Sequence, residues 1–170
     1  LRMLPVLRAI SHEPLGHLEP LRVTVKGEVL TITPDELVRI RSQVLEGRRI
    51  NRSRHVAEAA LLDRLWNRAV NEHGLPRGAF DGLITSQAAF VMFMQAWWPR
   101  LEAGEVLARL GDRELLNRVA SSLSEHERDL LARSFDPGLL VPPHGRRHPN
   151  WSVADVALLD ELVAIIGVAE

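Results

Sequence analysis

The run WSVADVALLDELVAIIG (Trp151–Gly167) is apolar on nearly every face of the helix that it would form. Residues at helical spacing make one apolar face, and others fill the remaining faces: Val156, Leu159, Leu162, Val163 and Ile166, then Val153, Leu158 and Ile165. A helix that is apolar all round has to be covered by other parts of a protein. Only three residues follow Gly167, and the chain opens Leu-Arg-Met-Leu. We therefore expect this sequence to be a piece of a longer protein.

Composition sets broad limits on the fold and function of the chain. A chain of 170 residues with 46% hydrophobic and 25% charged residues is typical of a globular protein with a sizeable core. The net charge of −1 gives no global reason for binding polyanions, so any basic surface must be local. The absence of cysteine excludes disulfides, thiolate zinc sites and thiol nucleophiles. Without a signal peptide or an apolar run of about 20 residues, we expect a cytoplasmic protein with no membrane partner.

Turn and cap signals predict a mostly α fold, an irregular helical domain with one small β-hairpin near the N-terminus. Two β-rich runs meet at Lys26-Gly27 and predict a hairpin over Leu21–Thr33. Thr33-Pro34-Asp35-Glu36 is a strong helix start, with Thr33 as N-cap and Glu36 closing a capping box. We expect residues 1–134 to form the helical domain, 135–150 a proline-rich projecting loop, and 151–170 a helix that leads back into a larger domain.

Apolar periodicity and caps place the other helices and the core. The expected helices are Ser53–His73, one from Thr85 or Ser86 to Trp98, Glu102–Leu110, Arg113–Ser121, one from Ser124 to about Arg133, and Ser152–Ile166. We expect Pro5 to interrupt a short opening helix and LPRGAFDG (Leu75–Gly82) to be a loop. The expected core is led by Leu62, Leu65, Trp66, Phe90, Phe93 and Trp97.

The strongest local concentration of charge is the arginine turn, which we define as Arg48–His55. Its candidate partner-binding residues are Arg48, Arg49, Arg52 and Arg54. Such a cluster can meet nucleic-acid phosphates or an acidic protein surface. It can equally be a solvated helix junction whose arginines pair with Glu46, Glu58 and Asp63. The residues alone leave both interpretations open.

The proline-rich loop Phe135–Asn150 is the second candidate contact element. It holds four prolines and two glycines, which exclude a helix. Loops of this length in a compact domain are often functional. Its candidate partner-binding residues are Asp136, His144, Arg146 and Arg147.

No pattern in the chain indicates catalysis. Leu158-Leu159-Asp160-Glu161 resembles a Walker B strand, but Ser152 and Asp155 predict a helix there. No G-x-x-x-x-G-K-[ST] loop is present to hold phosphates. The seven histidines lack the spacing of a metal site, and no serine, threonine or lysine lies in a nucleophile motif. We therefore expect this chain to have no enzymatic activity, no metal and no cofactor of its own.

Several segments, taken in order, carry a resemblance to one family. They are the opening LRM, the hairpin followed by LTITPDEL, the arginine turn, FMQAWWPRLEAGEVLARLGDRELLNRVA, SEHERDLLARS and WSVADVALLDELVAIIG. The most specific are WPRL-x-x-x-E-x-L (Trp98–Leu107) and ADVALLDE (Ala154–Glu161). Together they cover most of the chain. They resemble successive parts of the actinobacterial HelD-like proteins, which are UvrD/Rep-type superfamily 1 helicase-like ATPases that act on RNA polymerase.

The resemblance implies a binding role. In that family, such a segment is an insertion in the first motor domain, between the Walker A part and the Walker B strand. ATP and magnesium would be bound by the parent protein, and the remainder of the motor domain would be a partner of this piece. The family's insertion packs against RNA polymerase and props its clamp open, and a loop enters the primary channel, where it competes with nucleic acid. ATP then drives release, which recycles the polymerase. By position, Phe135–Asn150 corresponds to that loop.

Two alternatives remain open at this point. The chain could be a DNA-contacting accessory domain of a conventional UvrD-like DNA helicase, with its arginines on DNA. It could also be a free-standing helical adaptor with no motor attached.

Overall fold

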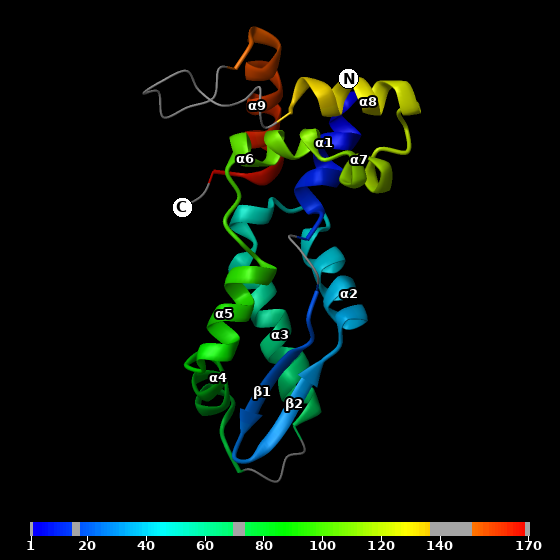
Figure 1. Ribbon diagram of the computed structural model, residues 1–170. Helices are drawn as coiled ribbons and strands as arrows, with labels where there is room; N and C mark the ends of the chain where they lie inside the picture. The colour runs from blue at the N-terminus through cyan, green and yellow to red at the C-terminus, as the bar shows by residue number, and fades with distance from the viewer. Residues whose placement is uncertain (1, 15–17, 70–73, 137–150, 169–170) are drawn as a thin grey trace. The chain divides into compact units, whose positions relative to one another are not determined.

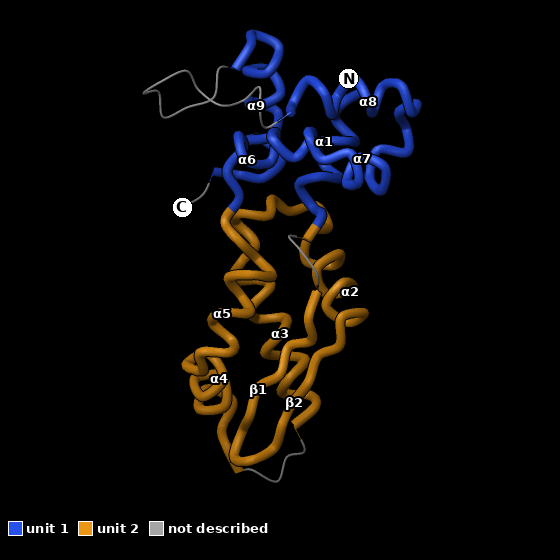
Figure 2. The backbone as a smooth tube through the Cα atoms, in the orientation of Figure 1, with its two compact units in different colours: residues 1–13, 101–170 blue, residues 14–100 orange. Residues whose placement is uncertain are grey.

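A computed structural model describes residues 2–14, 18–69, 74–136 and 151–168 of the chain. These residues are mostly helical and include one two-stranded antiparallel hairpin, as the sequence predicts (Figure 1). The chain divides into two compact units (Figure 2). Unit 1 comprises Leu1–Glu13 and Leu101–Glu170, and unit 2 comprises Pro14–Arg100. Unit 2 is thus inserted into the sequence of unit 1.

The hairpin of unit 2 forms at the predicted place. Strands β1 (Leu21–Val25) and β2 (Glu28–Ile32) pair antiparallel around Lys26 and Gly27. Both turn residues have a positive φ, 46° and 87°, which is the geometry of a two-residue type I′ turn and suits glycine at its second position. One face of the hairpin is buried by alternate residues: Leu21, Val23, Val25, Leu30 and Ile32.

Two side chains from outside the hairpin bond to the backbone of its outer edges. The Gln87 amide donates to the carbonyl of Thr24 at 2.7 Å and accepts from the N–H of Thr24 at 3.1 Å. On the other strand, Arg68 donates to the carbonyl of Thr31. A two-stranded hairpin alone is marginally stable, and open edges invite pairing with other chains. These contacts join the hairpin to the helices of its own unit.

Within its described residues, unit 2 also contains five helical segments. In chain order they are α2 (Pro34–Leu45), the 3₁₀ turn η1 (Ile50–Arg52), α3 (Arg54–Arg68), α4 (Arg77–Thr85) and α5 (Ala88–Trp97). The predicted capping box is present, since Thr33 accepts from the N–H of Glu36 while Glu36 accepts from the N–H of Thr33. Helix α2 packs on α3, α3 packs on β2, and both α4 and α5 pack on β1.

The loop predicted over Leu75–Gly82 is wrong, because most of this segment belongs to α4. Gly78 and Gly82 lower the helical propensity by about 1 kcal/mol each relative to alanine. They lie in open space, while Phe80 and Ile84 are one helical turn apart and fully buried. Packing of these two side chains therefore outweighs local propensity. Helix α5 consequently begins at Ala88, after the Thr85 and Ser86 start that the sequence favoured.

The core of unit 2 matches the expectation at four of six positions. Leu62, Leu65, Phe90 and Trp97 are buried, whereas Trp66 and Phe93 are only half-buried. Trp66 packs edge-on against Phe80, with 5.0 Å between ring centroids, and the Arg77 guanidinium covers its ring at 5.6 Å. Phe93 stacks on Trp97 at 5.6 Å. Both residues therefore lie at the margin of the core, and Trp98 is the fully buried tryptophan instead.

The described part of unit 1 contains helices and no strands. Its elements are α1 (Met3–His12), α6 (Ala103–Ala108), the 3₁₀ turn η3 (Arg109–Gly111), α7 (Arg113–Val119), α8 (Glu125–Ser134) and α9 (Val153–Ile166). Pro5 does not interrupt α1 as expected, because it lies in the first turn, where a missing N–H costs no helical hydrogen bond. Capping boxes open α8 at Ser124 and α9 at Ser152, as predicted.

Helix α9 packs on α6 and α1 mainly through its second half. Leu162 and Ile166 are buried in unit 1. Val153, Val156 and Val163 remain 91%, 48% and 41% exposed, so much of this apolar helix is not covered by the described residues.

We predict that Leu65→Ala destabilises the chain by about 2–5 kcal/mol, because a fully buried leucine leaves a cavity when it is truncated. Chemical denaturation followed by circular dichroism would measure the loss. Val38→Ala is the control on a half-exposed site of α2 and should change stability by less than about 0.5 kcal/mol. A loss below about 1 kcal/mol for Leu65→Ala would contradict the assigned core.

Candidate partner-binding surface

The carboxyl end of α5 is held by an arginine from α2. Arg41 is 5% exposed and its Nη1 donates to the carbonyl of Trp97 at 2.7 Å. Its guanidinium carbon also lies 4.8 Å from the ring centroid of Trp98. The last carbonyl groups of a helix have no partner within the helix, and the helix dipole favours a cation there. Arg41 therefore has a structural role.

Arg54, at the start of α3, also donates to carbonyl groups at the end of α5. Its Nη1 donates to the carbonyl of Trp98 at 2.7 Å and to that of Met94 at 3.4 Å. In return, the indole N–H of Trp98 donates to the carbonyl of Ile50, inside the arginine turn, at 2.9 Å. These bonds fix the turn against α5. They also give Arg54, a predicted partner-binding residue, a half-buried internal position.

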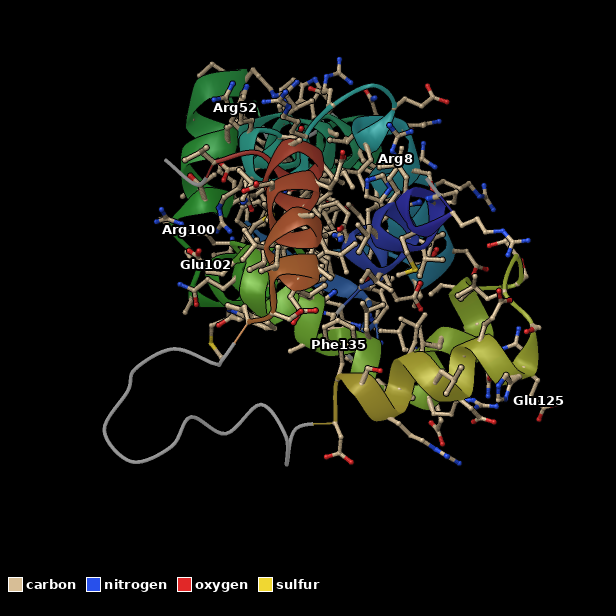
Figure 3. The ribbon with its side chains drawn as sticks, turned by 90° about the horizontal axis from the view of Figure 1, so that it is seen from above. Arg8, Arg52, Arg100, Glu102, Glu125 and Phe135 are labelled. Carbon is tan, nitrogen blue, oxygen red and sulfur yellow. The ribbon has the colours of Figure 1, made fainter. Side chains whose placement is uncertain are left out.

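The other arginines of the turn face solvent. Arg48 is exposed, with one bond from its Nη1 to the carbonyl of Val44 at 3.3 Å. Arg49 and Arg52 are exposed, and their side chains make no hydrogen bond or ion pair within the described residues. Figure 3 labels Arg52 among the surface side chains. The structure therefore supplies free positive charge at two of the four predicted positions, on a turn whose backbone is fixed.

The sequence also allowed the arginines of the turn to pair with Glu46, Glu58 and Asp63. Asp63 instead pairs with an arginine of α4. The Asp63 carboxylate accepts from Arg77 at 2.6 Å, and Arg77 also donates to Asp81 at 2.8 Å. These two carboxylates raise the pKa of Arg77, first through the bond to Asp63. Asp63 is thus tied to α4 rather than to the arginine turn.

A groove of about 380 Å³ lies between α2 and α3. Four residues from each helix line it: Glu36, Arg39, Ile40 and Gln43, then Ala60, Asp63, Arg64 and Asn67. Both sets follow the spacing i, i+3, i+4, i+7 and so form one stripe on each helix. The spacing of each stripe can be seen in the sequence, but no local pattern indicates that the two stripes face each other.

Glu36 is the acidic centre of this groove. Its backbone bond at Thr33, then its bonds from Arg64 and Arg68, lower the pKa of this carboxyl from 4.5 to about 2. Arg64 donates through Nη2 at 2.6 Å and through Nε at 3.1 Å. The carboxylate is therefore charged and fully engaged near neutral pH.

The proline-rich loop is described only at its beginning. Phe135 is buried at the end of α8, and Asp136 follows it in an exposed position (Figure 3). His144, Arg146 and Arg147, three of the predicted contact residues, lie outside the described residues.

Within the described ranges, no cluster of three or more histidine, cysteine, aspartate or glutamate side chains could hold a metal ion. No helix in that part of the chain is long and apolar enough to span a membrane. Neither a protein-family model nor a curated protein matches the sequence.

We predict that Arg41→Ala costs about 1.5–3 kcal/mol of stability, because it leaves a buried carbonyl of α5 without its charged donor. Arg49→Ala is the matched control, since its side chain makes no bond within the described residues, and should cost less than about 0.5 kcal/mol. Denaturant midpoints of the two variants would test this. Equal midpoints would mean that Arg41 does not support the end of α5.

We also predict an acid dependence that arises from Glu36. Its pKa is lower in the folded chain than its ordinary value of 4.5. The charged form therefore adds stability above about pH 4.5, and this contribution is lost as the pH falls toward about 2. Glu36→Gln should flatten the fall in unfolding free energy between these pH values, whereas Glu46→Gln, at an exposed helix end, should follow the wild-type profile. A variant as acid-sensitive as the wild type would contradict this role.

Proposed function

We propose that this chain is a non-catalytic insertion domain of a HelD-like helicase-related ATPase, which binds RNA polymerase, props open its clamp and helps release nucleic acid. Two lines of argument support the proposal. The first is the resemblance of the ordered segments to that family. The second, which carries most weight, is the pair of exposed arginines, Arg49 and Arg52, on a turn whose backbone is anchored to α5. ATP and magnesium would belong to the rest of the parent protein.

The form of the arginine turn favours an acidic protein surface over DNA as its partner. Proteins that bind duplex DNA electrostatically commonly make about 6–10 phosphate contacts. Arg54 is engaged within unit 2, so the arginine turn itself offers Arg49 and Arg52, with Arg48 beside them, to an external partner. The whole chain also has a net charge of −1. A few fixed charges suit steering toward a complementary protein patch.

The proposal predicts a kinetic effect of charge reversal. The double variant Arg49→Glu and Arg52→Glu should associate with purified RNA polymerase about tenfold more slowly, with a weaker dependence on salt, because rim charges act mainly on association. Dissociation should change by no more than about twofold. Surface plasmon resonance with nuclease-treated polymerase would measure both rates. Arg22→Glu, an exposed site on β1 of the same unit, is the matched control and should behave as the wild type.

Other results would favour the alternatives. A double variant that associates normally with polymerase but loses affinity for DNA would support the accessory domain of a DNA helicase. A wild-type chain that binds neither polymerase nor DNA would support the free-standing adaptor.

A further inference from the structure

The groove between α2 and α3 is built by two antiparallel helices whose lining residues face each other. Glu36, in the first turn of α2, accepts from Arg64 and Arg68 in the last part of α3, so the start of one helix lies beside the end of the other. The bond between Arg64 and Glu36 crosses the groove and fixes this register. Ile40 and Ala60 are the apolar members of the lining, and the other six are polar or charged.

Both carboxylates of the groove already accept from arginines, whereas some of its guanidinium groups make no bond within the described residues. Glu36 accepts from both Arg64 and Arg68, and Asp63 accepts from Arg77. By contrast, the guanidinium of Arg39 makes no hydrogen bond or ion pair within the described residues. Arg64 bonds through Nε and Nη2, which leaves its Nη1 without a bond in the same part of the chain, and its side chain is 49% exposed.

We propose that this groove binds carboxylate side chains of an acidic, extended segment of a protein partner, with Arg39 as the main anchor and Arg64 as the second donor. Arginine presents paired N–H groups that match the two oxygens of a carboxylate. The amides of Gln43 and Asn67 can donate to the peptide backbone or to a second carboxylate. A volume of about 380 Å³ accommodates a few side chains, and the polar lining differs from the mostly apolar walls of small-molecule sites.

The same charges disfavour a nucleic acid as the occupant. Phosphates follow one another at fixed spacing along a strand, so a strand in the groove would pass the carboxylates of Glu36 and Asp63. A peptide can place an acidic side chain at Arg39 and uncharged residues elsewhere.

Arg64 needs little reorganisation to take part. Its position is set by the Glu36 carboxylate, and Glu36 is itself held by the capping box at Thr33. A donor that is fixed before binding loses less conformational entropy when the ligand arrives. Arg39 supplies the adjustable contact from the facing helix.

This inference rests on the proposed function in one respect, the acidic protein partner. The arginine turn joins the two helices of the groove. A polymerase segment bound in the groove and an acidic patch of the polymerase bound to Arg49 and Arg52 would therefore belong to one interface. Binding in the groove is nevertheless measurable without polymerase.

The test uses the whole chain and a fluorescein-labelled peptide with two central glutamates in a glycine–serine sequence, followed by fluorescence anisotropy at low salt. Arg39→Glu should weaken binding at least tenfold, and Arg39→Ala about fivefold. Arg22→Ala, at an exposed site on β1, should remain within about twofold of the wild type. The peptide with glutamine in place of glutamate should bind at least tenfold more weakly than the acidic one.

Two results would overturn the groove assignment. One is a peptide affinity that Arg39→Glu leaves unchanged, with circular dichroism showing the variant to be folded. The other is a single-stranded oligonucleotide that binds more tightly than the peptide and depends on Arg39.

The polymerase measurement separates the two proposals. Slow association of the Arg49 and Arg52 variant, with no effect of Arg39 on the peptide, would retain the proposed function and remove the groove. Normal association of the Arg49 and Arg52 variant, with peptide binding lost in Arg39→Glu, would retain the groove and contradict the proposed role of the arginine turn.

Discussion

Helix α5 ends among buried side chains, and the carbonyl groups of its last turn need donors that water cannot supply there. Arg41 from α2 and Arg54 from α3 provide them, and Trp98 returns a hydrogen bond to Ile50 in the turn between those helices. An unsatisfied buried carbonyl costs more than a typical hydrogen bond contributes, so these bonds constrain the packing of all three helices. The arginine turn has a fixed shape because the end of α5 requires it.

This arrangement divides the arginines from Arg41 to Arg54 into two kinds. Arg41 and Arg54 direct their charge into unit 2, and the exposed Arg49 and Arg52 keep theirs for solvent or a partner. The proposed binding of an acidic surface therefore depends on a scaffold that other arginines stabilise. A substitution among these arginines would change stability or recognition according to which kind it affects.

The hairpin illustrates a second constraint, the need to satisfy open strand edges. Its position and its turn are determined locally, by Lys26-Gly27 and by the β-rich runs on either side of them. Its stability depends on Gln87 and Arg68, which are far away in sequence and pair with backbone groups of Thr24 and Thr31. No local pattern identifies these partners, since a glutamine at a helix N-cap and an arginine at a helix end are common in helical proteins and do not indicate a strand contact.

The sequence by itself determined the helical class, the hairpin and the capped helix starts at Thr33, Ser124 and Ser152, because these depend on neighbours within a few residues. It also located the arginine turn as a concentration of charge. Only the tertiary structure decided that α4 is a helix, that Arg54 is internal, and that the stripes of α2 and α3 enclose a groove. Those features depend on side chains that are distant along the chain and meet only on packing, where burial outweighs local propensity.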